Sequence, residues 1–128
     1  MDPVPIPAAT PLTEPYWAAC RRGELALQRC AACTRYVHFP EPVCPYCGGT
    51  DLPYTPVSGH GAVHTYSVIE RTFLPGFQPP YTVAWIDLPE GARVFGRLTA
   101  GEPRIGLPVE VHFEDLPGFG PIPQWRSA

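Results

Sequence analysis

Two closely spaced cysteine pairs constrain the fold of this chain more than any other feature. Cys30 and Cys33 are separated by two residues, Cys44 and Cys47 are separated in the same way, and ten residues lie between the pairs. A tight turn at each pair directs two sulfurs towards a common point, and a tetrahedral ion accepts four thiolates at about 2.3 Å. The spacing therefore predicts one four-cysteine metal site that holds structural zinc.

Disulfides and iron are the alternatives for these four cysteines. Two disulfides would require an oxidising compartment, and the N-terminal residues do not have the pattern of a secretory leader. Iron stays open, because the run Cys44-Pro45-Tyr46-Cys47-Gly48 also suits rubredoxin-type electron carriers. The gap between the pairs is short for a self-standing rubredoxin, so zinc is the expected metal. Since protein fills all four positions of such a site, we expect the ion to be structural and not catalytic.

The composition of the 128-residue chain indicates a turn-rich protein with a packed core. Nineteen prolines and twelve glycines imply many turns and few long helices. A hydrophobic content of 45% is enough for a core. No apolar run approaches the ~20 residues of a membrane span. We therefore expect a cytoplasmic protein with no membrane contact.

The N-terminal part is predicted to hold an extended, proline-rich arm and one short helix. Residues 1–12 contain four prolines and no apolar periodicity. Thr13 is a suitable N-cap, and the helix that follows is expected to end near Arg22. Tyr16 and Trp17 lie on its apolar side. A helix of two turns does not persist alone, so this side must pack on its own domain or on another subunit.

Alternating apolar residues predict a mainly β chain that ends in a five-stranded barrel. The expected ribbon strands are residues 24–29 and 35–39, and the expected barrel strands are residues 60–70, 81–88, 92–99, 108–114 and 121–126. Five short strands in about 70 residues fit an OB-fold barrel. The predicted parts are an arm at 1–12, a helix with a rubredoxin-like zinc ribbon at 13–57, and an OB-fold domain at 58–128.

Two apolar, proline-rich segments, 73–80 and 116–125, are unusual because loops normally expose polar groups. Large apolar side chains in such segments imply burial against the barrel, a partner or a ligand. With the two aromatic residues of the helix, the candidate contact residues are Tyr16, Trp17, Phe73, Leu74, Phe77, Phe119 and Trp125.

The sequence offers no convincing catalytic group. His60, His64 and Tyr66 share one face of a strand, but no paired acid or nucleophile elbow accompanies them in the sequence. We interpret them as residues of a solvated face, and we interpret His38 as a surface or packing residue and not a fifth metal ligand. No catalytic residue is therefore predicted.

Several motifs, taken in order, resemble a family of small zinc-ribbon/OB-fold accessory proteins that was long a domain of unknown function. The matching runs are Gly23-Glu24-Leu25-x-Leu27-Gln28-Arg29-Cys30-x-x-Cys33, Pro40-x-x-x-Cys44-Pro45-x-Cys47-Gly48, Val57-Ser58-Gly59-x-Gly61-x-Val63, Asp87-Leu88-Pro89-Glu90-Gly91, Val94-x-Gly96 and Ile105-Gly106-x-x-Val109. The resemblance covers roughly residues 13–126.

The resemblance implies an N-terminal helix pair, a rubredoxin-like ribbon and an OB barrel. It also implies an obligate, non-catalytic subunit of an acyl-CoA enzyme, with an acyl-CoA ligand shared at the interface. Thiolase-superfamily proteins, including thiolases and steroid side-chain-cleaving aldolases, are the expected partners, and a hot-dog-fold enoyl-CoA hydratase is the alternative. Arg71, Arg93 and Arg97 fit either contacts to CoA phosphates or ordinary surface charges.

A single-stranded nucleic-acid-binding module is the alternative from another functional class, because zinc ribbons and OB barrels both serve that role. Such binders need a basic groove with stacking aromatic residues. Acidic residues outnumber basic ones twelve to nine here, for a net charge of -3. We therefore expect no nucleic-acid partner.

Overall fold

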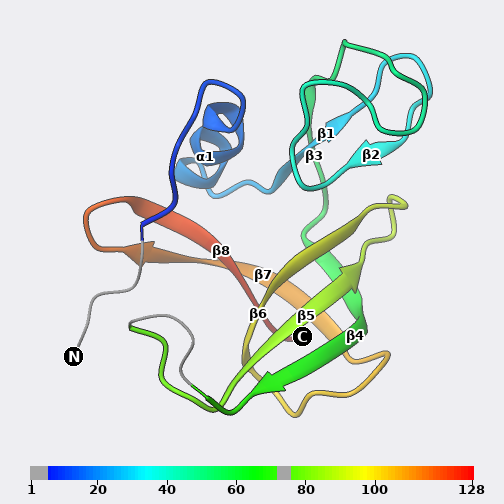
Figure 1. The fold of residues 1–128 in the computed structure, drawn as a ribbon. Helices are drawn as coiled ribbons and strands as arrows, with labels where there is room; N and C mark the ends of the chain where they lie inside the picture. The colour runs from blue at the N-terminus through cyan, green and yellow to red at the C-terminus, as the bar shows by residue number, and fades with distance from the viewer. Residues whose placement is uncertain (1–5, 72–75) are drawn as a thin grey trace.

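The structure, a computed structural model, describes residues 6–71 and 76–128 (Figure 1). Its described part contains one helix, α1 (Glu14–Arg21), and two sheets. The ribbon sheet consists of β1 (Ala26–Arg29), β2 (Tyr36–Val37) and β3 (Tyr54–Pro56), and the barrel consists of β4 (His60–Ile69), β5 (Tyr81–Asp87), β6 (Arg93–Ala100), β7 (Pro108–Leu116) and β8 (Gly120–Ser127). The predicted mainly β architecture is confirmed.

The ribbon sheet is antiparallel, in the order β2-β1-β3. The two strands predicted around the first cysteine pair are present but shorter than expected. The third strand, β3, was not predicted, because three residues that end in Pro56 give too little alternation to read. Pro56 is tolerated since β3 lies at the edge of the sheet and needs no second ladder partner.

The barrel closes in the order β4-β5-β6-β8-β7, with β7 returning to pair with β4. All five predicted barrel strands are present. Closure depends on a parallel pairing between β6 and β8, which places Leu98 opposite Trp125. Side chains such as Val63 and Ile86, at most 2% exposed, fill the interior.

The ribbon and α1 lie on the same side of the barrel (Figure 1). Leu25, just before β1, and Leu27 in it belong to the same buried cluster as the barrel core. The helix packs on the β7–β8 hairpin, where the Trp17 and Phe119 rings meet edge to face with centroids 4.9 Å apart. The two predicted parts of the chain are therefore joined by one continuous core.

The N-terminal entry to α1 differs from the prediction. Thr13 occupies the N-cap position, but its hydroxyl lies 3.2 Å from that of Thr10 and, within the described residues, caps no helix N–H. The backbone N–H groups of Thr13 and Glu14 both donate to the Thr10 carbonyl. The end of the arm is thus a turn that leads directly into the helix, and not an extended segment. Within residues 6–71 and 76–128, no helix has the length and apolar character required to cross a membrane.

Candidate metal centre and neighbouring surfaces

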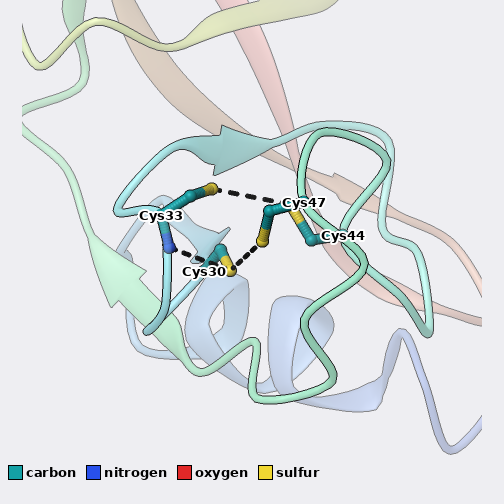
Figure 2. Close-up of side chains that lie close together, drawn as sticks. All are labelled: Cys30, Cys33, Cys44 and Cys47. Carbon is teal, nitrogen blue, oxygen red and sulfur yellow. Dashed lines mark hydrogen bonds between the residues drawn. The ribbon is translucent and has the colours of Figure 1, made fainter.

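The four cysteines of the two pairs converge on one point at the tip of the ribbon (Figure 2). Cys30 and Cys33 lie in the turn between β1 and β2, and Cys44 and Cys47 lie in the loop between β2 and β3. Their four sulfur atoms are all within 4.8 Å of one another. The Cys30–Cys47 sulfur pair is 3.5 Å apart, and the Cys33–Cys44 pair is 3.7 Å apart.

These distances fit a tetrahedral thiolate site. Four sulfurs at about 2.3 Å from one ion are about 3.8 Å from each other, whereas a disulfide needs about 2.05 Å. All five cysteines of the chain are free thiols. The donor set is therefore suited to zinc, which would fix the two cysteine turns to each other and leave no ligand position for water or substrate.

A buried glutamine positions the second cysteine pair. The side chain of Gln28, only 2% exposed, donates to the Glu41 carbonyl at 2.9 Å and accepts from the Glu41 N–H at 2.8 Å. Glu41 lies three residues before Cys44. This two-point contact anchors the long β2–β3 loop to the central ribbon strand, so the loop reaches the first pair in a fixed register.

Backbone amides support the sulfur atoms. The Cys33 N–H donates to the Cys30 sulfur at 3.5 Å, and it contributes most among the hydrogen bonds that lower the pKa of the Cys30 thiol to about 7. The Gly49 N–H donates to the Cys47 sulfur at 3.4 Å. A Cβ at Gly49 would lie only 3.1 Å from the Cys30 sulfur, so a side chain here would crowd the metal centre and the sulfur would have to shift by a few tenths of an ångström. Amide donors that stabilise thiolates are the environment a metal-bound cysteine requires.

Cys20 and His38 do not belong to the metal centre. Cys20 is 1% exposed in α1, and burial raises the pKa of its thiol to about 11. The His38 ring stacks on Phe39 with centroids 4.5 Å apart, and desolvation lowers the pKa of the imidazole to about 4. Among the described residues, both ring nitrogens of His38 are buried without a hydrogen-bond partner. His38 is thus a packing residue, as predicted.

The candidate contact residues lie in different environments. Phe73 and Leu74 lie outside the described residues. Trp17 and Phe119 are half-buried against each other, and Tyr16 is half-buried against the core.

The last two candidate contact residues lie on the barrel. Trp125 is 2% exposed inside the barrel, so the structure corrects the expectation that it faces a partner. Its indole fills the space left by Gly96, and the sequence offered no sign of that pairing. Phe77 is half-buried beside Tyr81, with ring centroids 5.4 Å apart.

The aromatic cluster of Phe39, Trp85 and Phe95 was missed by the sequence analysis. It joins the ribbon to the outer face of β5 and β6, with ring centroids 5.1–6.2 Å apart. Phe39 is 55% exposed and Phe95 is 39% exposed. One signal in the sequence could have indicated this cluster, because β5 is apolar at every position from Val83 to Ile86. Successive residues of a strand point to opposite faces, so both faces of β5 carry apolar side chains.

The strand that carries His60 and His64 contains a contact that the sequence analysis did not foresee. The Nδ1 of His64 lies 3.1 Å from the carboxylate of Asp87, which also accepts a hydrogen bond from Arg93 at 2.6 Å. All three side chains are about half exposed. Such exposed pairs are typical of a solvated surface, and Arg93 is accordingly a paired surface charge.

Comparison with known proteins agrees with this architecture. Residues 17–53 match the family described as "ChsH2, rubredoxin-like zinc ribbon domain", and residues 54–114 match "ChsH2, C-terminal OB-fold domain". The structure is similar to a chain of the solved "Ltp2-ChsH2(DUF35) aldolase", with a TM-score of 0.83 and 33% identity, over 95% of this chain and 98% of that one.

Two curated relatives of the chain are named as subunits of acyl-CoA enzymes. A "Probable enoyl-CoA hydratase alpha subunit" of Thermomonospora curvata is 36% identical over 122 residues, which cover 88% of this chain but only 38% of that protein. The "Benzoylsuccinyl-CoA thiolase subunit BbsA" of Thauera aromatica is 34% identical over 73 residues, which cover 55% of this chain and 48% of that one. The chain thus spans less than half of the length of these two relatives, while the two family matches together cover most of its own. The chain belongs to the ChsH2 family, in which a rubredoxin-like zinc ribbon is joined to a C-terminal OB-fold domain.

Proposed function

We propose that this chain is a non-catalytic accessory subunit of an acyl-CoA-processing enzyme of the thiolase superfamily, either a thiolase or an aldolase that cleaves a steroid side chain by a retro-aldol step. The partner carries the catalytic groups. The observation that supports this most strongly is the likeness, over 98% of that chain's length, to a chain of the solved Ltp2-ChsH2(DUF35) aldolase. In this proposal the metal is zinc. The proposed location is the cytoplasm, since none of the five cysteines forms a disulfide and this suits a reducing compartment.

The surface chemistry supports a protein partner. The exposed Phe39 and Phe95 and the half-buried Trp85 form an aromatic cluster across the ribbon–barrel junction. Exposed aromatic residues are enriched in the energetic centres of protein interfaces. We take this cluster as the centre of the contact, in place of the buried Trp125. Phe77 adjoins it, since both Phe77 and Phe95 line one cavity.

Co-purification tests the proposal. The chain, carrying an affinity tag, is co-expressed with a thiolase-superfamily protein encoded beside its gene. We expect a stable complex of defined stoichiometry, and we expect the partner expressed alone to be insoluble or inactive. A partner that is soluble, fully active and unaffected by this chain would refute the role.

A hot-dog-fold enoyl-CoA hydratase is the second candidate partner. The 36% identity to part of a protein named as a hydratase alpha subunit favours it. The same co-expression with a neighbouring hydratase distinguishes the two, because only the true partner is expected to co-elute and to gain activity.

A further inference from the structure

A cavity of about 350 Å³ lies on the outside of the barrel, away from the metal centre. The residues that line it include Phe77, Tyr81, Val83, Phe95, Arg97 and Ile122. Cavities of about 300–1,000 Å³ with mainly apolar walls and a few polar groups are typical of small-molecule sites. This cavity therefore has the size and lining of a ligand site.

The apolar wall is built from outward-facing strand positions. Val83 on β5 lies directly opposite Arg97 on β6 in the strand register. The neighbours Ala84 and Leu98 point inward and are at most 6% exposed. Outward positions of an antiparallel barrel are normally polar. Apolar side chains at Val83 and Ile122 therefore need an explanation beyond the stability of the barrel core.

Arg97 supplies the cationic group of the cavity. Its guanidinium carbon lies 5.8 Å from the ring centroids of both Phe77 and Tyr81, so aromatic rings hold the side chain in place. Within the described part of the chain, its Nε is buried and has no hydrogen-bond partner. A guanidinium stays charged at all relevant pH values, and a buried donor without an acceptor is unfavourable. An anionic ligand would provide the missing acceptor.

The charged residues of the cavity limit the charge of that ligand. Glu114 and Asp115 on β7 also line it. Both side chains are exposed to solvent, which weakens their repulsion of a ligand anion. Arg97 is a single cation and can compensate one carboxylate, but not a second negative charge. The cavity thus selects a molecule with an apolar body and a single negative charge.

We propose that this cavity binds a small monocarboxylic acid with an apolar body, of the fatty or arylalkanoic class. The carboxylate accepts from Arg97, and the apolar body packs against Val83, Phe95 and Ile122. This site goes beyond the proposed accessory role and does not depend on it, because every group that forms it belongs to this chain.

The test uses the full chain without any partner. Octanoate is titrated by calorimetry and by aromatic fluorescence, and 1-octanol serves as the uncharged probe. We expect saturable binding of one octanoate per chain and at least about tenfold weaker binding of octanol, since a charge-assisted hydrogen bond is lost.

Three variants locate the binding. Arg97→Leu is expected to weaken octanoate binding about tenfold and to leave octanol binding unchanged. Arg104→Leu removes an exposed arginine outside the cavity and should change neither. Val83→Trp, which fills the cavity, should abolish binding of both probes while the circular dichroism spectrum is retained.

The opposite results overturn the proposal. One such result is an absence of saturable octanoate binding. The others are an equal loss of octanoate affinity in Arg97→Leu and Arg104→Leu, or undiminished octanoate binding by a folded Val83→Trp protein. If Val83→Trp fails to fold, the comparison of the two arginine variants still decides the outcome. Because no partner protein is present, failure here is distinct from failure of the accessory-subunit proposal.

Discussion

Trp125 occupies the space that a side chain at position 96 would need. A Cβ built on Gly96 would lie 2.5 Å from Cδ1 and 2.7 Å from Nε1 of the Trp125 indole. The two residues belong to β6 and β8, the strands whose parallel pairing closes the barrel. The missing side chain at Gly96 thus allows the largest buried side chain of the protein to lie across the closure point.

The first prediction concerns this contact. Gly96→Ala should lower the free energy of unfolding by about 1–3 kcal/mol, because a rigid indole must move to admit the methyl group. Ala100→Val, at the exposed end of the same strand, should change it by less than about 0.5 kcal/mol. Urea unfolding followed by tryptophan fluorescence measures both. Equal stability of the two variants would show that the barrel closure tolerates a shift of Trp125.

The second prediction concerns the metal centre. Cys30→Ser or Cys44→Ser should reduce bound zinc from one per chain to well under one, and should unfold the ribbon, since structural zinc contributes on the order of 10 kcal/mol in small modules. Cys20→Ala removes a buried thiol outside the site and should keep one zinc per chain. Metal analysis with circular dichroism provides the measurement. Stoichiometric zinc in Cys44→Ser, or iron in the native protein, would contradict the assignment.

The third prediction concerns the pH dependence introduced by His38. Burial lowers the pKa of its imidazole from 6.5 to about 4, so the unfolded chain binds a proton in this interval that the folded chain does not. The contribution of neutral His38 to the free energy of unfolding is therefore fully present above about pH 6.5. It is lost as the pH falls towards 4, because protonation then favours the unfolded chain. When the pH is lowered from 7 to 5, the free energy of unfolding of the native protein should fall by about 1–2 kcal/mol more than that of the His38→Phe variant. Parallel urea titrations of the two proteins test this, and identical pH profiles would count against it.

The fourth prediction concerns the aromatic cluster. Phe95→Ser should raise the dissociation constant for the partner enzyme at least about tenfold, because central aromatic contacts carry most of the binding energy of an interface. Ile105→Ser is the matched control, since Ile105 is 72% exposed and lies outside the cluster. Surface plasmon resonance compares them. A larger effect at Ile105 would place the interface elsewhere.

The metal site and the barrel strands were predictable because both are encoded locally. The four cysteines need only two short turns to meet, and the barrel strands show alternation within single segments. The strand β3 was not predictable, since its three residues are held by pairing with β1 and not by a pattern of their own. Thr13 matched a capping residue by type, but the nearby Thr10 competes for its hydroxyl.

The surfaces were harder to predict, because they depend on distant parts of the chain. Phe39 meets Trp85 only after the ribbon docks on the barrel. Trp125 follows a proline-rich segment and resembles a loop residue in sequence, yet its burial depends on the pairing of β8 with β6. Arg97 carried no local sign that its Nε would be buried.

The most direct test of the accessory role is acyl-CoA turnover measured for this chain alone, for its thiolase-superfamily partner alone, and for the reconstituted complex at equal concentrations. We predict turnover by the complex, none by this chain and little or none by the partner alone. Thioester turnover by this chain without any other protein, or a partner that reaches full activity in its absence, would contradict the account.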